Sequence, residues 1–130
     1  MDYNHYERMV RDFCECRGAP QAAGEAIESR HLEIDGHLVG LVPREGAGLD
    51  IFIEMGHTWP GDDAPLYERL LRFNLDAGPQ LVGFFGLHPS GSHVAYRMRV
   101  AGGLSGTELS DLLHDQLPAA VRAYHQICNA

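Results

Sequence analysis

One short segment constrains the fold of this chain most, because it predicts two antiparallel strands joined by a tight turn. Within residues 31–43, Leu32 and Ile34 alternate with polar residues, which is typical of a half-buried strand. Asp35 and Gly36 follow directly, and an Asp-Gly pair supplies the positive φ angles that a two-residue hairpin turn requires. The sequence therefore predicts a protein built around an antiparallel sheet.

Hydrophobic periodicity predicts the other elements of the fold. Apolar residues recur at helical spacing in 2–17, 64–76 and 107–128, and extended patterns predict further strands at 49–55, 81–87 and 94–100. The expected order is helix, three antiparallel strands, helix, two antiparallel strands and a long C-terminal helix. No repeat or linker divides the chain, so we expect residues 1–130 to form a single α+β domain.

Polar and proline residues indicate where two of these helices begin and bend. Asp62 or Asp63 is expected to cap the helix at 64–76, and Ser105 or Thr107 the one at 107–128. Pro118 lies inside the last helix and is expected to kink it.

Composition excludes several classes of function. The net charge is −8, with 18 acidic and 10 basic residues, so nucleic acid and anionic membrane surfaces are unfavourable partners. All the basic residues are arginines, which removes chemistry that depends on a Schiff-base or P-loop lysine. The three cysteines are an odd number in a chain without a secretory signal or a membrane-spanning apolar run, which predicts a cytoplasmic protein with reduced thiols.

The eight histidines are the candidates for metal binding or acid–base chemistry. His88 and His93 bracket a predicted turn and could face each other across two strands, but zinc usually takes three or four protein ligands. We expect no catalytic residue, no metal and no cofactor. A small metal-binding protein or enzyme using His57, His88 and His93 remains the alternative.

The strands carry more apolar residues than a one-sided sheet needs. The surplus is predicted to lie on the faces opposite the Leu and Ile stripes, and it comprises Val39, Leu41, Phe52, Val82 and Phe84. Either helices of the same chain cover both faces of the sheet, or a second copy or client protein covers one of them.

The order of elements and two short motifs resemble one protein family. Residues 32–36 read Leu-Glu-Ile-Asp-Gly at the first strand and turn, and residues 70–75 read Leu-Leu-Arg-Phe-Asn-Leu on the middle helix. Over nearly its whole length the chain resembles the class I type III secretion chaperones, the Tir-chaperone (CesT) family.

This resemblance implies a non-enzymatic homodimer in the bacterial cytoplasm that serves virulence. Such a chaperone binds the extended N-terminal segment of a type III effector, keeps it soluble and export-competent, and needs no ATP or metal. A dimeric regulator or scaffold of the same fold, without an export client, is a further alternative.

The resemblance also implies two sets of site residues, some of which must be ordinary core residues. The implied dimer interface comprises Leu66, Leu70, Leu71, Phe73, Leu81, Val82, Phe84 and Phe85. The implied effector-binding surface comprises Tyr6, Met9, Val10, Phe13, Leu32, Ile34, Val39, Leu41 and Phe52.

Overall fold

A computed structural model describes residues 1–46, 48–57, 64–78, 80–88 and 93–129 of the chain. It contains a five-stranded antiparallel sheet in the order β1-β2-β3-β5-β4. The strands are β1 (His31–Ile34), β2 (His37–Arg44), β3 (Gly48–His57), β4 (Phe84–Leu87) and β5 (His93–Val100). The helices are α1 (Tyr3–Cys16), the short 3₁₀ turn η1 (Pro20–Ala22), α2 (Ala23–Ser29), α3 (Ala64–Asp76) and α4 (Gly106–Cys128).

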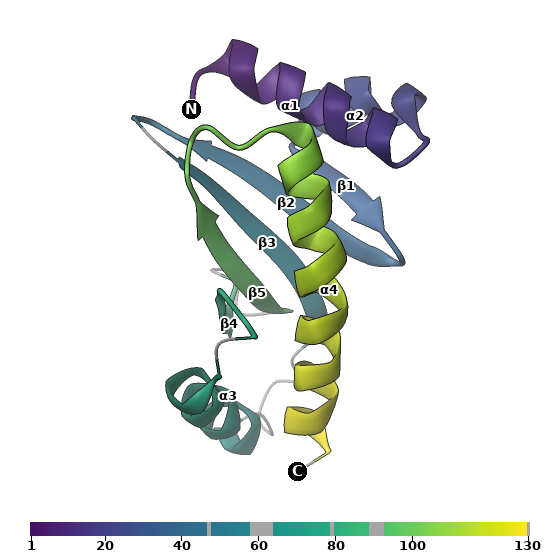
Figure 1. Ribbon diagram of the computed structural model, residues 1–130. Coiled ribbons are helices and arrows are strands. Elements are labelled where there is room, and N and C mark those ends of the chain that lie inside the picture. Colours follow the sequence, from purple (N-terminus) through teal and green to yellow (C-terminus); the bar gives the residue numbers. More distant parts are fainter. Residues whose placement is uncertain (47, 58–63, 79, 89–92, 130) are drawn as a thin grey trace.

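The helices are distributed unevenly around this sheet (Figure 1). The ribbon of α4 crosses the strands on one side of the sheet, and α1 lies across one end with α2 beside it, while α3 lies at the opposite end beside β4. We call the side that carries α4 the inner face, and the other side the outer face. The predicted α+β architecture with a long C-terminal helix is confirmed.

The predicted hairpin is present with the expected turn. Ile34 pairs with His37, and the two residues between them have positive φ angles of 51° at Asp35 and 82° at Gly36. Positive φ at both central positions is the geometry that matches the twist of a two-residue hairpin. The local sequence thus fixes the register of β1 against β2.

The core lies between the inner face and the helices α1 and α4. Strand pairing places Val39 opposite Ile53 and Leu41 opposite Ile51, and all four side chains are fully buried. The prediction that Val39 and Leu41 lie on the face opposite the Ile stripe is therefore wrong. Their alternation along β2 puts them in register with the buried residues of β3, on the same face.

Helix α4 begins with the predicted Ser105 cap. The Ser105 hydroxyl accepts from the Glu108 backbone N–H, and the Glu108 carboxylate accepts from the Ser105 N–H, each at 3.1 Å, which completes a capping box. The helix continues through Pro118 to Cys128, so the proline does not end it. Asp62 and Asp63, the predicted caps of α3, lie outside the described residues.

Two other elements differ from the prediction. The sequence did not predict helix α2. Its seven residues bury only Ala23, Ala26 and Ile27, and no side chain caps its start, so its local signal is weak. Strand β4 is shorter than the predicted 81–87, because side chains rather than a neighbouring strand bind the backbone before it. The N–H of Val82 donates to the Gln116 amide oxygen at 3.1 Å, and that of Gly83 to the Tyr96 hydroxyl at 2.7 Å.

Candidate functional site

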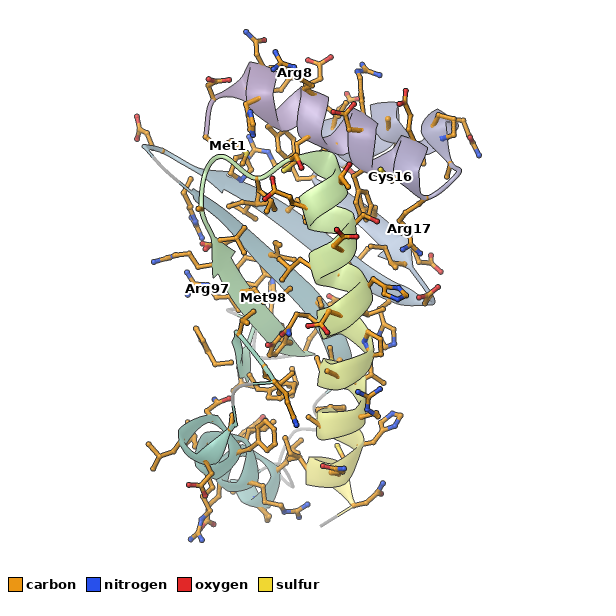
Figure 2. All side chains as sticks on the ribbon, viewed as in Figure 1. Met1, Arg8, Cys16, Arg17, Arg97 and Met98 are labelled. Carbon is orange, nitrogen blue, oxygen red and sulfur yellow. The ribbon has the colours of Figure 1, made fainter. Side chains whose placement is uncertain are left out.

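The outer face carries an apolar groove. Neighbouring residues of β5 alternate between the two faces, so that Met98 is fully buried in the core whereas Arg97 lies on the outer face; both are labelled in Figure 2. The groove has a volume of about 320 Å³ and crosses β2, β3 and β5. Its lining residues are His31, Leu38, Gly40, Val42, Arg44, Phe52, Glu54, His88, His93 and Ala95.

Beside this groove, one carboxylate holds three arginines. Asp50 of β3 is fully buried and accepts hydrogen bonds from Arg44 Nε at 2.5 Å, Arg97 Nη2 at 3.1 Å and Arg99 Nε at 2.9 Å. Arg97 also lies over the rings of Phe52 and Phe84, at 5.8 and 5.7 Å from their centroids. We call Asp50 with Arg44, Arg97 and Arg99 the arginine cluster.

The cluster lowers the pKa of the Asp50 carboxyl well below its usual range. The hydrogen bond from Arg99 is the largest cause, and those from Arg44 and Arg97 add to it, while burial opposes them. Since the carboxyl has a lower pKa folded than unfolded, it stabilises the fold above the unfolded value near pH 4. This contribution is lost as the pH falls from there towards the folded pKa.

We therefore expect Asp50→Asn to lower the free energy of unfolding at pH 7 by about 2 kcal/mol, because the amide carries no negative charge to balance the three arginines and offers them one acceptor oxygen instead of two. The difference from the wild type should shrink below pH 4, because there the unfolded wild-type chain takes up a proton on Asp50 while the folded chain does not, which favours unfolding of the wild type. Urea unfolding at pH 7 and at pH 2.5 measures both values. An equal difference at the two pH values would contradict the ionic role of Asp50.

Further exposed apolar residues lie on α3 and within residues 82–87. They keep between 45% and 88% of their surface exposed, and they are Leu71, Leu75, Val82, Phe84 and Leu87. Leu71 and Leu75 are one helical turn apart and so share a face of α3. We call these five residues the α3–β4 surface.

The α3–β4 surface contains three of the eight residues predicted at a dimer interface. Leu71, Val82 and Phe84 are exposed, whereas Leu70 and Phe85 are buried at 4% and 2% and belong to the core. The remaining three, Leu66, Phe73 and Leu81, are half-buried against that core. A partner on this side can therefore cover the exposed residues without disturbing Leu70 or Phe85.

Asn74 explains the polar position in the motif at 70–75. Its side-chain amide donates to the Phe85 carbonyl at 2.7 Å, and its side-chain oxygen accepts from the Phe85 N–H at 2.8 Å. Asn74 thus pairs with the edge strand β4 as a neighbouring strand would, and it joins α3 to the sheet. An unpaired edge would otherwise present these groups to another chain.

Asn74→Ala is expected to lower the free energy of unfolding by about 1–3 kcal/mol, because it leaves both backbone groups of Phe85 without this partner. Amide hydrogen exchange at Phe85 should accelerate by about fivefold to a hundredfold, as a loss of about 1–3 kcal/mol predicts. Asn4→Ala, on the exposed side of α1, is the control. Unchanged exchange at Phe85 would rule out this role of Asn74.

Most of the predicted effector-binding residues lie in the core. Seven of the nine keep at most 3% of their surface exposed, so they are occupied by contacts within the chain: Tyr6, Met9, Val10, Phe13, Ile34, Val39 and Leu41. Their apolar periodicity reflects packing between α1, α4 and the sheet. Leu32 and Phe52 are only half-buried, and they are the predicted residues that retain surface for a partner.

His88 and His93 lie close together, and no metal site forms around them among the described residues. The ring centroids of His88 and His93 are 5.7 Å apart, and His93 Nε2 lies 3.4 Å from a Glu54 carboxylate oxygen. Within the described part of the chain, no three His, Cys, Asp or Glu residues gather where they could hold one metal ion. The side chain of His57 lies outside the description.

Sequence reasoning missed the arginine cluster, the groove that adjoins it and the role of Asn74. A signal for the cluster is present in the sequence, because Asp50 on one predicted strand and Arg97 and Arg99 on another alternate with apolar residues. The register that brings these strands together could not be read from either strand alone.

Among the described residues, none of the helices is long and apolar enough to cross a membrane.

Comparison with known proteins gives a family match and several similar folds, two of which are described below. The sequence model of the Tir chaperone protein (CesT) family matches residues 13–123. No curated protein has a significantly matching sequence.

The fold is similar to a chain of the HopA1–SchA chaperone–effector complex, with a TM-score of 0.59, 15% identity and coverage of 97% of this chain and 98% of that one. It is also similar to a chain of the heterodimeric ExoU–SpcU complex from the type III secretion system of Pseudomonas aeruginosa. That match has a TM-score of 0.56 and 17% identity, and covers 75% of this chain and 79% of the other. At these identities the likeness supports the fold.

Proposed function

Because this chain belongs to the Tir chaperone protein (CesT) family, we propose that it acts as a homodimeric type III secretion chaperone for the extended N-terminal segment of an effector. The family is one of chaperones, so the chain is a chaperone and not an enzyme. The match over residues 13–123, which spans most of the fold, is the observation that carries the proposal. We place its action in the bacterial cytoplasm, before export.

The distribution of apolar surface supports a protein that works by covering another chain. The α3–β4 surface is one set of exposed apolar residues, and the outer-face groove offers further apolar surface. In the proposal the first joins two copies of the chaperone, and the second receives the client. Apolar burial contributes about 25 cal/mol per Å² before the client's ordering cost is subtracted, so binding needs no ATP.

This division of surfaces has a physical rationale. A client held in extended form offers apolar side chains on alternate positions, and a shallow groove over a sheet receives such side chains one at a time. A helix with adjacent exposed leucines instead suits a second, identical helix, because the same patch meets itself across a two-fold axis.

The test is co-expression with a secreted protein encoded beside the chaperone, using its N-terminal segment and, separately, the remainder. We expect the N-terminal segment to be soluble and to co-purify only when the chaperone is present. The remainder should behave alike with and without it. If the segment is equally soluble alone and does not co-purify, the export-client role fails and a regulator or scaffold of this fold becomes the better account.

A further inference from the structure

The outer-face groove differs in charge between its two ends. Antiparallel pairing places Val42 beside Asp50 and Asp50 beside Arg99, so the arginine cluster occupies one end. The opposite end carries Glu54, a groove-lining residue that the register places beside Ala95 of β5. Between the two ends the floor is apolar.

Gly40 lies in the middle of the groove floor, where it adds no side chain. It is buried, it pairs with Phe52, and a Cβ built on it would meet the His31 ring at 3.6 Å and the Phe52 Cβ at 3.8 Å, which are ordinary contact distances. A Cβ alone would therefore fit at this position without strain. The glycine's lack of a side chain leaves room for an apolar side chain of another molecule between β1 and β3.

The arginine cluster carries more positive charge than its own carboxylate neutralises. Three guanidinium groups share Asp50, which leaves a surplus of two charges within a protein whose net charge is −8. The side chains of Arg44 and Arg99 remain 49% and 66% exposed. A guanidinium has five N–H groups in a planar fork, and each of these two gives only one or two of them to Asp50.

Contacts within the chain also hold the arginines of the cluster in place. They are therefore better suited to binding a ligand than freely moving arginines at the surface would be. Asp50 fixes the three arginines from below, and Phe52 and Phe84 hold Arg97 through their ring faces. A carboxylate that docks on Arg44 and Arg99 therefore meets groups that have already lost much of their rotamer freedom. Pre-organisation of this kind lowers the ordering cost of binding.

We propose that the arginine cluster binds an acidic side chain of the client's extended segment, two residues away from an apolar side chain that lies over Gly40. The spacing follows from the register of the sheet. Gly40 pairs with Phe52, and Phe52 pairs with Arg97, so these three residues lie in one row across the strands. Arg99 lies two residues further along β5 than that row. Positions two apart in an extended chain point to the same side and lie about 7 Å apart. The identity of the partner as a secretion client rests on the proposed function, whereas the recognition of a carboxylate rests on the cluster.

A short peptide tests the cluster without any client. The probe is acetyl-Ser-Asp-Ser-Leu-Ser-Asp-Ser-amide, which offers a carboxylate on either side of leucine and so fits either chain direction; its twin has asparagine in place of aspartate. We expect NMR titration with the first peptide to shift the Arg44 and Arg99 side-chain N–H signals in a saturable, salt-sensitive manner, and the twin to leave them unchanged. Equal shifts with both peptides, or none with either, would overturn the proposal.

The second test uses the co-purified client segment and three chaperone variants. Arg44→Gln with Arg99→Gln, and Arg99→Gln alone as the milder change, remove the exposed arginines while Arg97 still pairs with Asp50. Gly40→Val fills the floor. Each should weaken client binding by about tenfold or more, as the loss of a charge-assisted hydrogen bond or of an apolar contact predicts, with the circular dichroism spectrum unchanged.

The matched control is Arg11→Gln with Arg72→Gln, which removes two exposed arginines that pair with glutamates on their own helices. This control should bind the client as the wild type does. If the cluster variants also bind it normally, the acidic anchor is wrong although the chaperone function stands. If the wild type binds no client while the peptide still shifts the cluster, the proposed function is wrong although the carboxylate site stands.

Discussion

Leu71→Glu combined with Leu75→Glu is expected to convert a dimer of this protein into monomers, raising the dissociation constant by about a thousandfold or more. The two leucines are 70% and 88% exposed in the single chain, so the fold does not depend on burying them. In a dimer with two-fold symmetry both copies contribute these leucines, so four leucine side chains would be buried. Burial of a leucine contributes about 1.5–3 kcal/mol, and each glutamate would place an unpaired charge in the contact.

Sedimentation equilibrium of the double variant and the wild type measures this change. Tyr3→Glu is the control, because Tyr3 is also a large exposed apolar residue, at 60%, but lies on α1 rather than on α3. The control should dimerise as the wild type does, and all three proteins should melt cooperatively. A double variant that dimerises normally would move the interface away from the α3–β4 surface.

The second large effect is expected at the crossing of α1 and α4. Gly106 is buried, and a Cβ built on it would lie 2.5 Å from the Asp12 Cβ, 2.5 Å from the Phe13 nitrogen and 2.7 Å from the Met9 carbonyl oxygen. Two of these atoms belong to the α1 backbone, which cannot rotate away as a side chain can. Gly106→Ala should therefore separate the helices and lower the free energy of unfolding by about 2–3 kcal/mol.

Gly24→Ala is the matched control for this substitution. Gly24 also lies in a helix, but no atom of a neighbouring element in the described part of the chain comes within 4 Å of a Cβ built on it. Alanine should therefore stabilise the protein by about 0.5–1 kcal/mol through helix propensity. Urea unfolding of both variants measures the pair. A stable Gly106→Ala protein would mean that α1 can shift without cost, and the close helix crossing would lose its importance for the core.

The elements that sequence predicts well are those with a strong local signal. The Asp35-Gly36 turn, the Ser105 cap and the apolar stripe of 64–76 each depend on neighbouring residues, and each is present. Helix α2 has no comparable signal, because it is short, has no side-chain cap and contains Gly24. It is helical because Ala23, Ala26 and Ile27 pack into the core that α1 and the sheet form.

The candidate site depends on contacts between distant segments, which explains why less of it could be predicted. The apolar stripe of α1 is the same whether it faces the core or a client, and only the packed structure shows that Tyr6 and Phe13 are buried. Conversely, Asp50 and Arg97 are 47 residues apart in sequence, and the β3–β5 register alone brings them together. Asn74 belongs to a motif that the sequence displays, but its bonds to Phe85 require the position of β4.

The central claim is that two copies of this chain hold one extended client, and the mass of the complex tests it most directly. Size-exclusion chromatography with light scattering should be performed on the chaperone alone and with the client's N-terminal segment. We expect twice the chain mass of 14.4 kDa for the protein alone, and that mass plus one client segment for the complex. A monomer that elutes unchanged in the presence of the segment would contradict the account.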